Sequence, residues 1–211
     1  MASAAPSSPA TTPDVDRQLE SLKLASSDAS VPPAEVFSAM MELEKSKQST
    51  SDWERQLNEG DETVRHTWRL VFASTSKDLE KARKTGTGGG NYFPITAVQS
   101  WTPASRTFQN GVFFGRILSL VFVGPYATKG KKISFDVEKV RLRLGPFAFS
   151  IQLKRPGLQD YTTFSPDPKS PFFLCVYADD SVIVARGRGG GIALWVKPLP
   201  EWELANGIEW A

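Results

Sequence analysis

Apolar and polar side chains alternate along the chain from Trp68 onward, and this two-residue period constrains the fold more than any other feature. Alternation of this kind is typical of a β-strand with one buried face. It begins with Trp68, Leu70 and Phe72 and recurs in short stretches separated by glycine and proline. Between the first two stretches, 76–84 reads as a short helix that ends at the glycine-rich segment 86–90. The later predicted strands are 93–101, 107–114, 117–123, 132–144, 147–153, 172–177, 181–185 and 192–197.

Many short strands joined by close turns, without long helices between them, favour an antiparallel sheet over βαβ units. A closed barrel leaves no exposed strand edge, so we predict a mainly β fold with an antiparallel β-barrel over residues 66–197. Within 132–144 the apolar positions change from odd numbers, as at Phe135, to even numbers, as at Leu142. This change predicts a β-bulge near Glu138, because one extra residue returns the apolar side chains to the same face.

The segments that flank the barrel differ from it in composition. Residues 1–32 are rich in Ala, Ser and Pro, and we expect disorder there because little apolar area is available to offset the ordering entropy. Residues 33–60 carry apolar side chains at helical spacings, which predicts short helices over about 33–45 and 51–58, the second capped by Ser51 or Asp52. Their apolar stripe should lie on the outside of the barrel or close one end, with a solvated amphipathic arm as the alternative. Residues 198–211 form a C-terminal tail, in which two tryptophans suggest docking on a surface.

The overall composition argues against several classes of function. The chain has 25 Lys plus Arg and 23 Asp plus Glu, and a net charge of +2 gives too weak a field to indicate a nucleic-acid partner. A single histidine, His66, and a single cysteine, Cys175, argue against a histidine-based zinc site, a histidine-activated nucleophile and an internal disulfide. We therefore expect neither catalysis nor a cofactor. No apolar run approaches the roughly 18 residues of a spanning helix, so we expect a soluble or peripheral protein.

Three polar motifs have alternative interpretations. Asp179 and Asp180 could be taken for a catalytic pair, but neighbours on a strand point to opposite faces, which favours a hairpin turn. The Arg-Gly segment 186–191 lies between two predicted strands, so a hairpin connection is favoured over nucleic-acid binding. Arg141 and Arg143 form either a solvated strand face or a basic patch for anionic lipid head groups.

A barrel of about eight strands has room for packed side chains or for one small ligand. The aromatic side chains on the predicted strands favour an apolar ligand, held in a cavity that opens toward residues 86–90. Ordinary core packing is the alternative for each of these residues. The candidates for lining the cavity are Trp68, Phe72, Phe93, Trp101, Phe108, Phe113, Phe122, Phe135, Phe149 and Tyr177.

The second half of the barrel resembles the plastid lipid-associated proteins, or fibrillins. The matching features are Tyr177, the acidic pair Asp179-Asp180, an apolar strand, Arg186-Gly187, and a second apolar strand that ends at Lys197. The stretches 68–72, 91–99 and 110–112 are also similar to parts of that family. One difference is His66, which stands where the family usually has a glycine two places before the opening tryptophan.

The resemblance implies a lipocalin-like barrel with short N-terminal helices, in a chloroplast or other plastid. It implies association with an apolar lipid, such as an isoprenoid quinone, a carotenoid or an acyl chain, and with plastoglobule, thylakoid or lipid-droplet surfaces. In lipocalin-like barrels a late arginine packs on the tryptophan of the first strand, so we expect Arg186 to close one end of the barrel on Trp68, with a solvated turn arginine as the alternative. The hydroxyl-rich N-terminus is similar to a transit peptide but lacks the usual arginines.

Two other functions stay open at this stage. The first is a scaffold with a filled barrel that contacts an enzyme of plastid lipid or quinone biosynthesis through the helical arm. The second is an enzyme on a lipocalin-like barrel, such as an isomerase or a hydrolase. The enzyme is the weaker alternative, because acid-base chemistry needs a group with a tuned pKa in a pocket and no nucleophile motif is recognisable.

Overall fold

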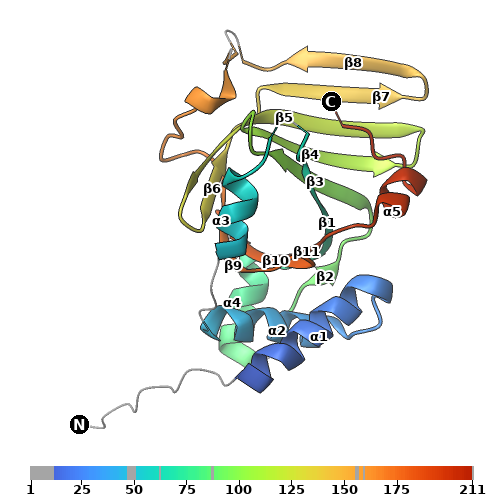
Figure 1. Ribbon diagram of the computed structural model, residues 1–211. Coiled ribbons are helices and arrows are strands. Elements are labelled where there is room, and N and C mark those ends of the chain that lie inside the picture. The colour runs from blue at the N-terminus through green and yellow to red at the C-terminus, as the bar shows by residue number, and fades with distance from the viewer. Residues whose placement is uncertain are drawn as a thin grey trace.

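The computed structural model describes residues 12–46, 51–61, 63–86, 88–154, 157–158 and 160–210. Figure 1 shows a ring of strands with helices α1, α2 and α4 grouped beside it. The helices are α1 (Thr12–Asp28), α2 (Pro33–Ser46), α3 (Ser51–Asn58), α4 (Ser76–Thr85) and α5 (Pro200–Ala205), with a 3-10 turn η1 (Tyr161–Thr163). The strands are β1 (His66–Ala73), β2 (Asn91–Tyr92), β3 (Thr96–Thr102), β4 (Thr107–Phe114), β5 (Leu118–Lys129), β6 (Lys132–Phe135), β7 (Lys139–Leu144), β8 (Phe147–Gln152), β9 (Phe172–Ala178), β10 (Val182–Gly187) and β11 (Ile192–Val196).

Eight strands close into an antiparallel barrel, which confirms the predicted fold class. The ring runs β1, β3, β4, β5, β6, β9, β10 and β11, and β11 pairs again with β1. The short strand β2 pairs with Phe72 and Ala73 at the C-terminal end of β1. The predicted helix before the glycine-rich segment is also confirmed, since α4 starts after Thr75 in a capping box with Asp78 and ends at Gly86, with φ of 70°.

The segment predicted as one strand over 132–144 is instead two strands, so the single strand is wrong, although the extra residue predicted near Glu138 lies between them. Both strands pair with the same edge of β5, which continues through Gly124 to Lys129. Tyr126 pairs with Phe135 and Val123 pairs with Lys139, so one extra residue is accommodated between the two pairings. The crossing chain lies so close to β5 that a Cβ on Gly124 would be 2.2 Å from the carbonyl oxygen of Asp136. From this crossing, the β7–β8 hairpin extends away from the ring (Figure 1).

Helix α3 closes one end of the barrel, as the sequence predicted for part of the helical arm. Its Trp53 and Leu57 are buried in the same cluster as the inward-facing Trp68. The Leu57 carbonyl accepts a hydrogen bond of 2.8 Å from the Tyr126 hydroxyl, and Gln56 donates to the Asp179 carbonyl at 3.3 Å. The proposed capping of α3 by Ser51 or Asp52 rests on side chains outside the described residues.

Helices α1 and α2 cover the outer faces of β10 and β11. Leu22 of α1 and Met40 of α2 are fully buried in one cluster with Val184 and Leu194. Burial of this stripe excludes the solvated arm that was the alternative for α2. The prediction of disorder over 1–32 is wrong for residues 12–28, because α1 gains from α2 the apolar contacts that its own composition cannot supply. Residues 1–11 lie outside the described residues.

The C-terminal segment docks on the outer face of β3, β4 and β5. Trp202 and Trp210 pack against a buried cluster that contains Phe113, and the rings of Phe113 and Trp210 are 5.7 Å apart. Arg143, only 9% exposed, pairs with Glu209 at 2.9 Å and donates to the Gly207 carbonyl at 3.0 Å. The solvated face predicted for Arg141 and Arg143 is therefore wrong, because both arginines hold this segment, Arg141 by donating to the Trp210 carbonyl at 3.3 Å.

Candidate functional site

Aromatic side chains pack against one another in the end of the barrel that α3 closes. The Trp53 and Trp101 rings are 5.3 Å apart, and Trp68 stacks on Trp101 at 6.4 Å. Across the interior, the rings of four further residues contact one another in series, with centroids 4.4 to 5.3 Å apart. These residues are Phe108, Phe135, Phe173 and Trp195. Four of the predicted cavity residues thus form a core at this end, namely Trp68, Trp101, Phe108 and Phe135.

The remaining candidates do not join them, so the prediction that the whole set lines one cavity is wrong. Phe72 lies outside the barrel under α1 and α2, because the ladder shifts register between Leu70 and Phe72 and turns the later side chain outward. Tyr177 packs against the same outer cluster, and Phe113 lies under the C-terminal segment. A cavity of about 490 Å³ does lie beside the glycine-rich segment, but it is outside the ring, between α2 and α4.

Arg186 does not pack on Trp68, so the predicted closure of the barrel by this pair is wrong. Its guanidinium forms an ion pair with Glu44 of α2 and donates to the Gly190 carbonyl at 2.8 Å. The reason is the alternation along β10, since Ile183 and Ala185 point inward and Arg186 therefore points outward. Arg186 fastens α2 to the outside of the barrel.

The acidic pair of the fibrillin-like motif is a hairpin turn, as predicted. The Asp179 carboxylate accepts hydrogen bonds from the backbone N–H of Ser181 and of Val182, each at 2.7 Å, and from the Tyr177 hydroxyl at 3.0 Å. Burial alone would raise the pKa of Asp179, but these hydrogen bonds hold it below the ordinary value. Asp180 is exposed, so the two carboxylates do not act together. The Arg-Gly segment likewise connects β10 and β11, with Gly187 and Gly191 bonded across the turn.

The β7–β8 hairpin carries a group of large apolar side chains that stay exposed. Every residue of β8 is exposed, including Phe147 at 64%, Phe149 at 57% and Ile151 at 58%. Their cross-strand partners on β7 are Leu144, Leu142 and Val140, and this pairing brings the six side chains to one face of the hairpin.

This face continues onto the two neighbouring strands of the barrel. Leu144, Leu142 and Val140 pair with Leu118, Leu120 and Phe122 of β5, and Leu118 pairs in turn with Phe114 of β4. These β4 and β5 residues share their side of the sheet with Phe108 and Tyr126, which point into the barrel. The exposed surface is therefore an extension of the inner face of the barrel. We name it the apolar face; it comprises Phe114, Leu118, Leu120, Phe122, Val140, Leu142, Leu144, Phe147, Phe149 and Ile151.

Two turns lie side by side at the free end of the apolar face. The Gly145 N–H donates to the Ile117 carbonyl at 2.6 Å, which joins the β7–β8 turn to the β4–β5 turn. Gly115 and Gly145 have φ of 57° and 56°, a conformation that glycine adopts without strain. Ile117, 72% exposed, projects from this end beside Arg116.

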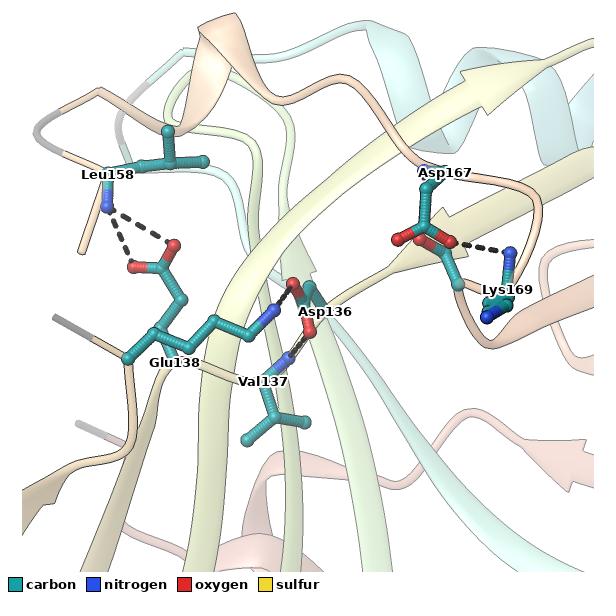
Figure 2. A network of polar contacts seen from close by, with 8 residues as sticks. Asp136, Val137, Glu138, Leu158, Asp167 and Lys169 are labelled. Carbon is teal, nitrogen blue, oxygen red and sulfur yellow. Dashed lines mark hydrogen bonds and ion pairs between the residues drawn. The ribbon is translucent and has the colours of Figure 1, made fainter. Parts of the chain in front are cut away.

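Polar contacts on the chain that enters and leaves the hairpin fix its base (Figure 2). Glu138, only 4% exposed, accepts from the Leu158 N–H at 3.1 and 3.2 Å through its two carboxylate oxygens. Asp136 forms an ion pair with Lys154 and accepts from the Val137 N–H at 2.8 Å. These contacts bind residues before β7 to residues after β8, so the hairpin projects from a fixed base.

Two other kinds of site are absent from the described residues. No group of three or more His, Cys, Asp or Glu side chains is arranged to hold a metal ion. Within the same residues, no helix combines the length and the apolar character needed to cross a bilayer.

No protein-family model matches the chain, and no curated protein matches it. Among solved structures, the chain is similar to a lipocalin-like protein from Bacteroides uniformis, with 13% identity and a TM-score of 0.38 over 68% of this chain and 99% of that one. It is also similar to a streptavidin-like protein from Bacteroides eggerthii, with 12% identity and a TM-score of 0.39 over 64% of this chain and 81% of that one. These likenesses are too distant to indicate a function, and the barrel is established by its own strand pairing.

Proposed function

We propose that this protein is a non-catalytic lipid-binding protein that docks on an apolar lipid surface through its apolar face. The observation that carries the proposal is the contiguous face of ten large apolar side chains across four strands, several of them more than half exposed. Exposed apolar patches larger than a few hundred Å² mark interaction or membrane sites in soluble proteins. The burial of such side chains in a lipid phase is favourable in proportion to the area removed from water.

The shape of the site favours a surface over an enclosed ligand. Aromatic packing occupies the α3 end of the barrel, whereas six of the ten residues of the apolar face lie on the hairpin that projects from the ring (Figure 1). At its tip Ile117 and Phe147 are strongly exposed, whereas the side chain of the neighbouring Arg116 lies against Gly207 of the C-terminal segment. This arrangement supports shallow insertion of the two turns.

The fibrillin resemblance adds a proposal about the membrane itself. Tyr177 of β9, Asp179 of the β9–β10 turn and Arg186 of β10 all make structural contacts, as a motif that maintains the barrel would. On that resemblance we propose membership of the fibrillin family and a plastid location, where the lipid surface is that of a plastoglobule or a thylakoid.

A scaffold function is the second candidate. The α3 end of the barrel favours a scaffold, because its own side chains occupy the interior there in place of a ligand. In this case the apolar face would bind an enzyme of lipid or quinone biosynthesis.

Flotation with phosphatidylcholine vesicles and with triacylglycerol emulsions separates the two candidates. We expect the wild-type protein to float with the lipid, and the double variant Phe149→Ser with Ile151→Ser to stay in the aqueous fraction. A matched control, Ser150→Ala with Gln152→Ser, changes exposed side chains on the opposite face of β8 and should float normally. Failure of the wild type to float would reject lipid docking and leave the scaffold.

A further inference from the structure

A second candidate site lies outside the barrel, where α1 and α5 meet β1. Arg69 of β1 donates a hydrogen bond of 2.5 Å to the Ser26 carbonyl of α1, and its guanidinium lies 5.0 Å from the centre of the Trp202 ring of α5. A guanidinium has five N–H donors, and the described contacts use one of them. Cavities of about 350 and 370 Å³ lie on the two sides of this arginine.

Positive charge collects around the larger of these two cavities. Lys23 of α1 and Lys197 at the end of β11 line it together with Arg69. Neither cavity has an Asp or Glu among the described residues that line it. The acidic side chain described beside this group is Asp179, which lies 3.8 Å from Lys23 and is already bonded to its own turn. Among the side chains that the structure describes, the cations therefore exceed the acids that face them.

Two electrostatic effects agree with this excess. Burial lowers the pKa of Arg69, and no carboxylate among the described side chains counteracts the effect. The pKa of His66 is lowered by burial and also by the positive charge of Lys197, so that charge still acts on its surroundings. A half-buried cation without an opposite charge is a group that an anion would stabilise.

We propose that Arg69, Lys23 and Lys197 form a binding site for a phosphate group carried by an organic ligand. The planar guanidinium matches phosphate oxygens in pairs, and the two ammonium groups add charge. The hydroxyls of Ser26 and Ser27 donate to carbonyls of α1, so the three cations are the donors of the site. Trp202 and the exposed Leu199 on the same cavity offer an apolar support for the rest of the ligand. The site is independent of the apolar face.

The test uses two phosphate sources and single variants of the full chain. Binding of inorganic phosphate is measured by calorimetric titration of the protein, with sodium chloride at equal ionic strength as the comparison. Retention of the protein on vesicles is measured with phosphatidylcholine alone and with added phosphatidic acid. Lys23→Gln and Lys197→Gln should each weaken phosphate binding by about tenfold, since each removes one charged hydrogen bond. Lys84→Gln is the control, because Lys84 is an exposed cation on α4 that lines neither cavity.

The outcomes identify the source of the phosphate or overturn the site. Binding of inorganic phosphate that the two site variants weaken supports a soluble phosphate ester. If inorganic phosphate does not bind, but the site variants lower the extra retention caused by phosphatidic acid, the ligand is a lipid head group. Equal effects of phosphate and chloride, with retention unchanged in Lys197→Gln, would overturn the proposal. Phe149→Ser should leave phosphate binding unchanged, so failure of this site is distinguishable from failure of the apolar face.

Discussion

Phe149 lies midway along β8, the outermost strand of the apolar face, opposite Leu142, and 57% of its surface is exposed. A phenylalanine side chain has on the order of 200 Å² of surface, so docking on lipid would remove roughly 110 Å² of it from water. At about 25 cal/mol per Å² this burial contributes at most about 3 kcal/mol. Because about 1.4 kcal/mol corresponds to a factor of ten, Phe149→Ser should weaken partition onto lipid by up to about 100-fold.

The same substitution should barely affect folding, because the side chain is exposed in the unbound protein. We expect the free energy of unfolding to change by less than about 0.5 kcal/mol in urea. Partition is measured as the fraction bound at increasing concentrations of phosphatidylcholine vesicles, with Ser150→Ala as the control on the opposite face. An unchanged partition coefficient for Phe149→Ser, or an equal loss in the control, would refute the reasoning.

Four other expectations follow from the contacts around the barrel. Arg186→Ala and Glu44→Ala should each lower the free energy of unfolding by about 1 kcal/mol. The double variant should lose less than the sum, because the two residues share one partly buried ion pair. Additive losses in urea unfolding would contradict this. Arg143→Met should release the C-terminal segment, so carboxypeptidase should digest the variant faster than the wild type, and equal rates would count against the contact. Burial raises the pKa of Tyr126 from 10.0 to about 12, so the folded state favours the neutral phenol. The free energy of unfolding should therefore fall by about 3 kcal/mol between pH 10 and 12. An equally steep fall with pH in Tyr126→Phe would disprove this. Burial also raises the pKa of the Cys175 thiol to about 12, so the folded protein should resist alkylation at pH 8 and react in urea; rapid reaction without urea would be inconsistent with this burial.

The positions of the strands were partly predictable from the sequence, and the reasons differ from element to element. Alternation identified most strands because each has one buried face, as in Trp68 and Leu70 of β1. The division of 132–144 into β6 and β7 was not predictable, because it depends on where the chain crosses β5 at Gly124. The same is true of α1, whose burial depends on α2.

The apolar face was only partly visible in the sequence. Phe122 and Phe149 were singled out, but as cavity residues, whereas Leu142, Phe147 and Ile151 were missed. Their alternation was a usable signal, since both strands of one short hairpin place large apolar residues on the same face. What the sequence could not show is that the C-terminal segment covers the opposite face, through Arg143, and leaves this one exposed.

Hydrogen–deuterium exchange with and without phosphatidylcholine vesicles tests lipid docking by the apolar face most directly. The account predicts slower exchange in β7, β8 and the turn at Gly115 when lipid is present, with α1 and α2 unchanged. Protection confined to the helices, or no protection at the hairpin in protein that is demonstrably bound to the vesicles, would contradict it.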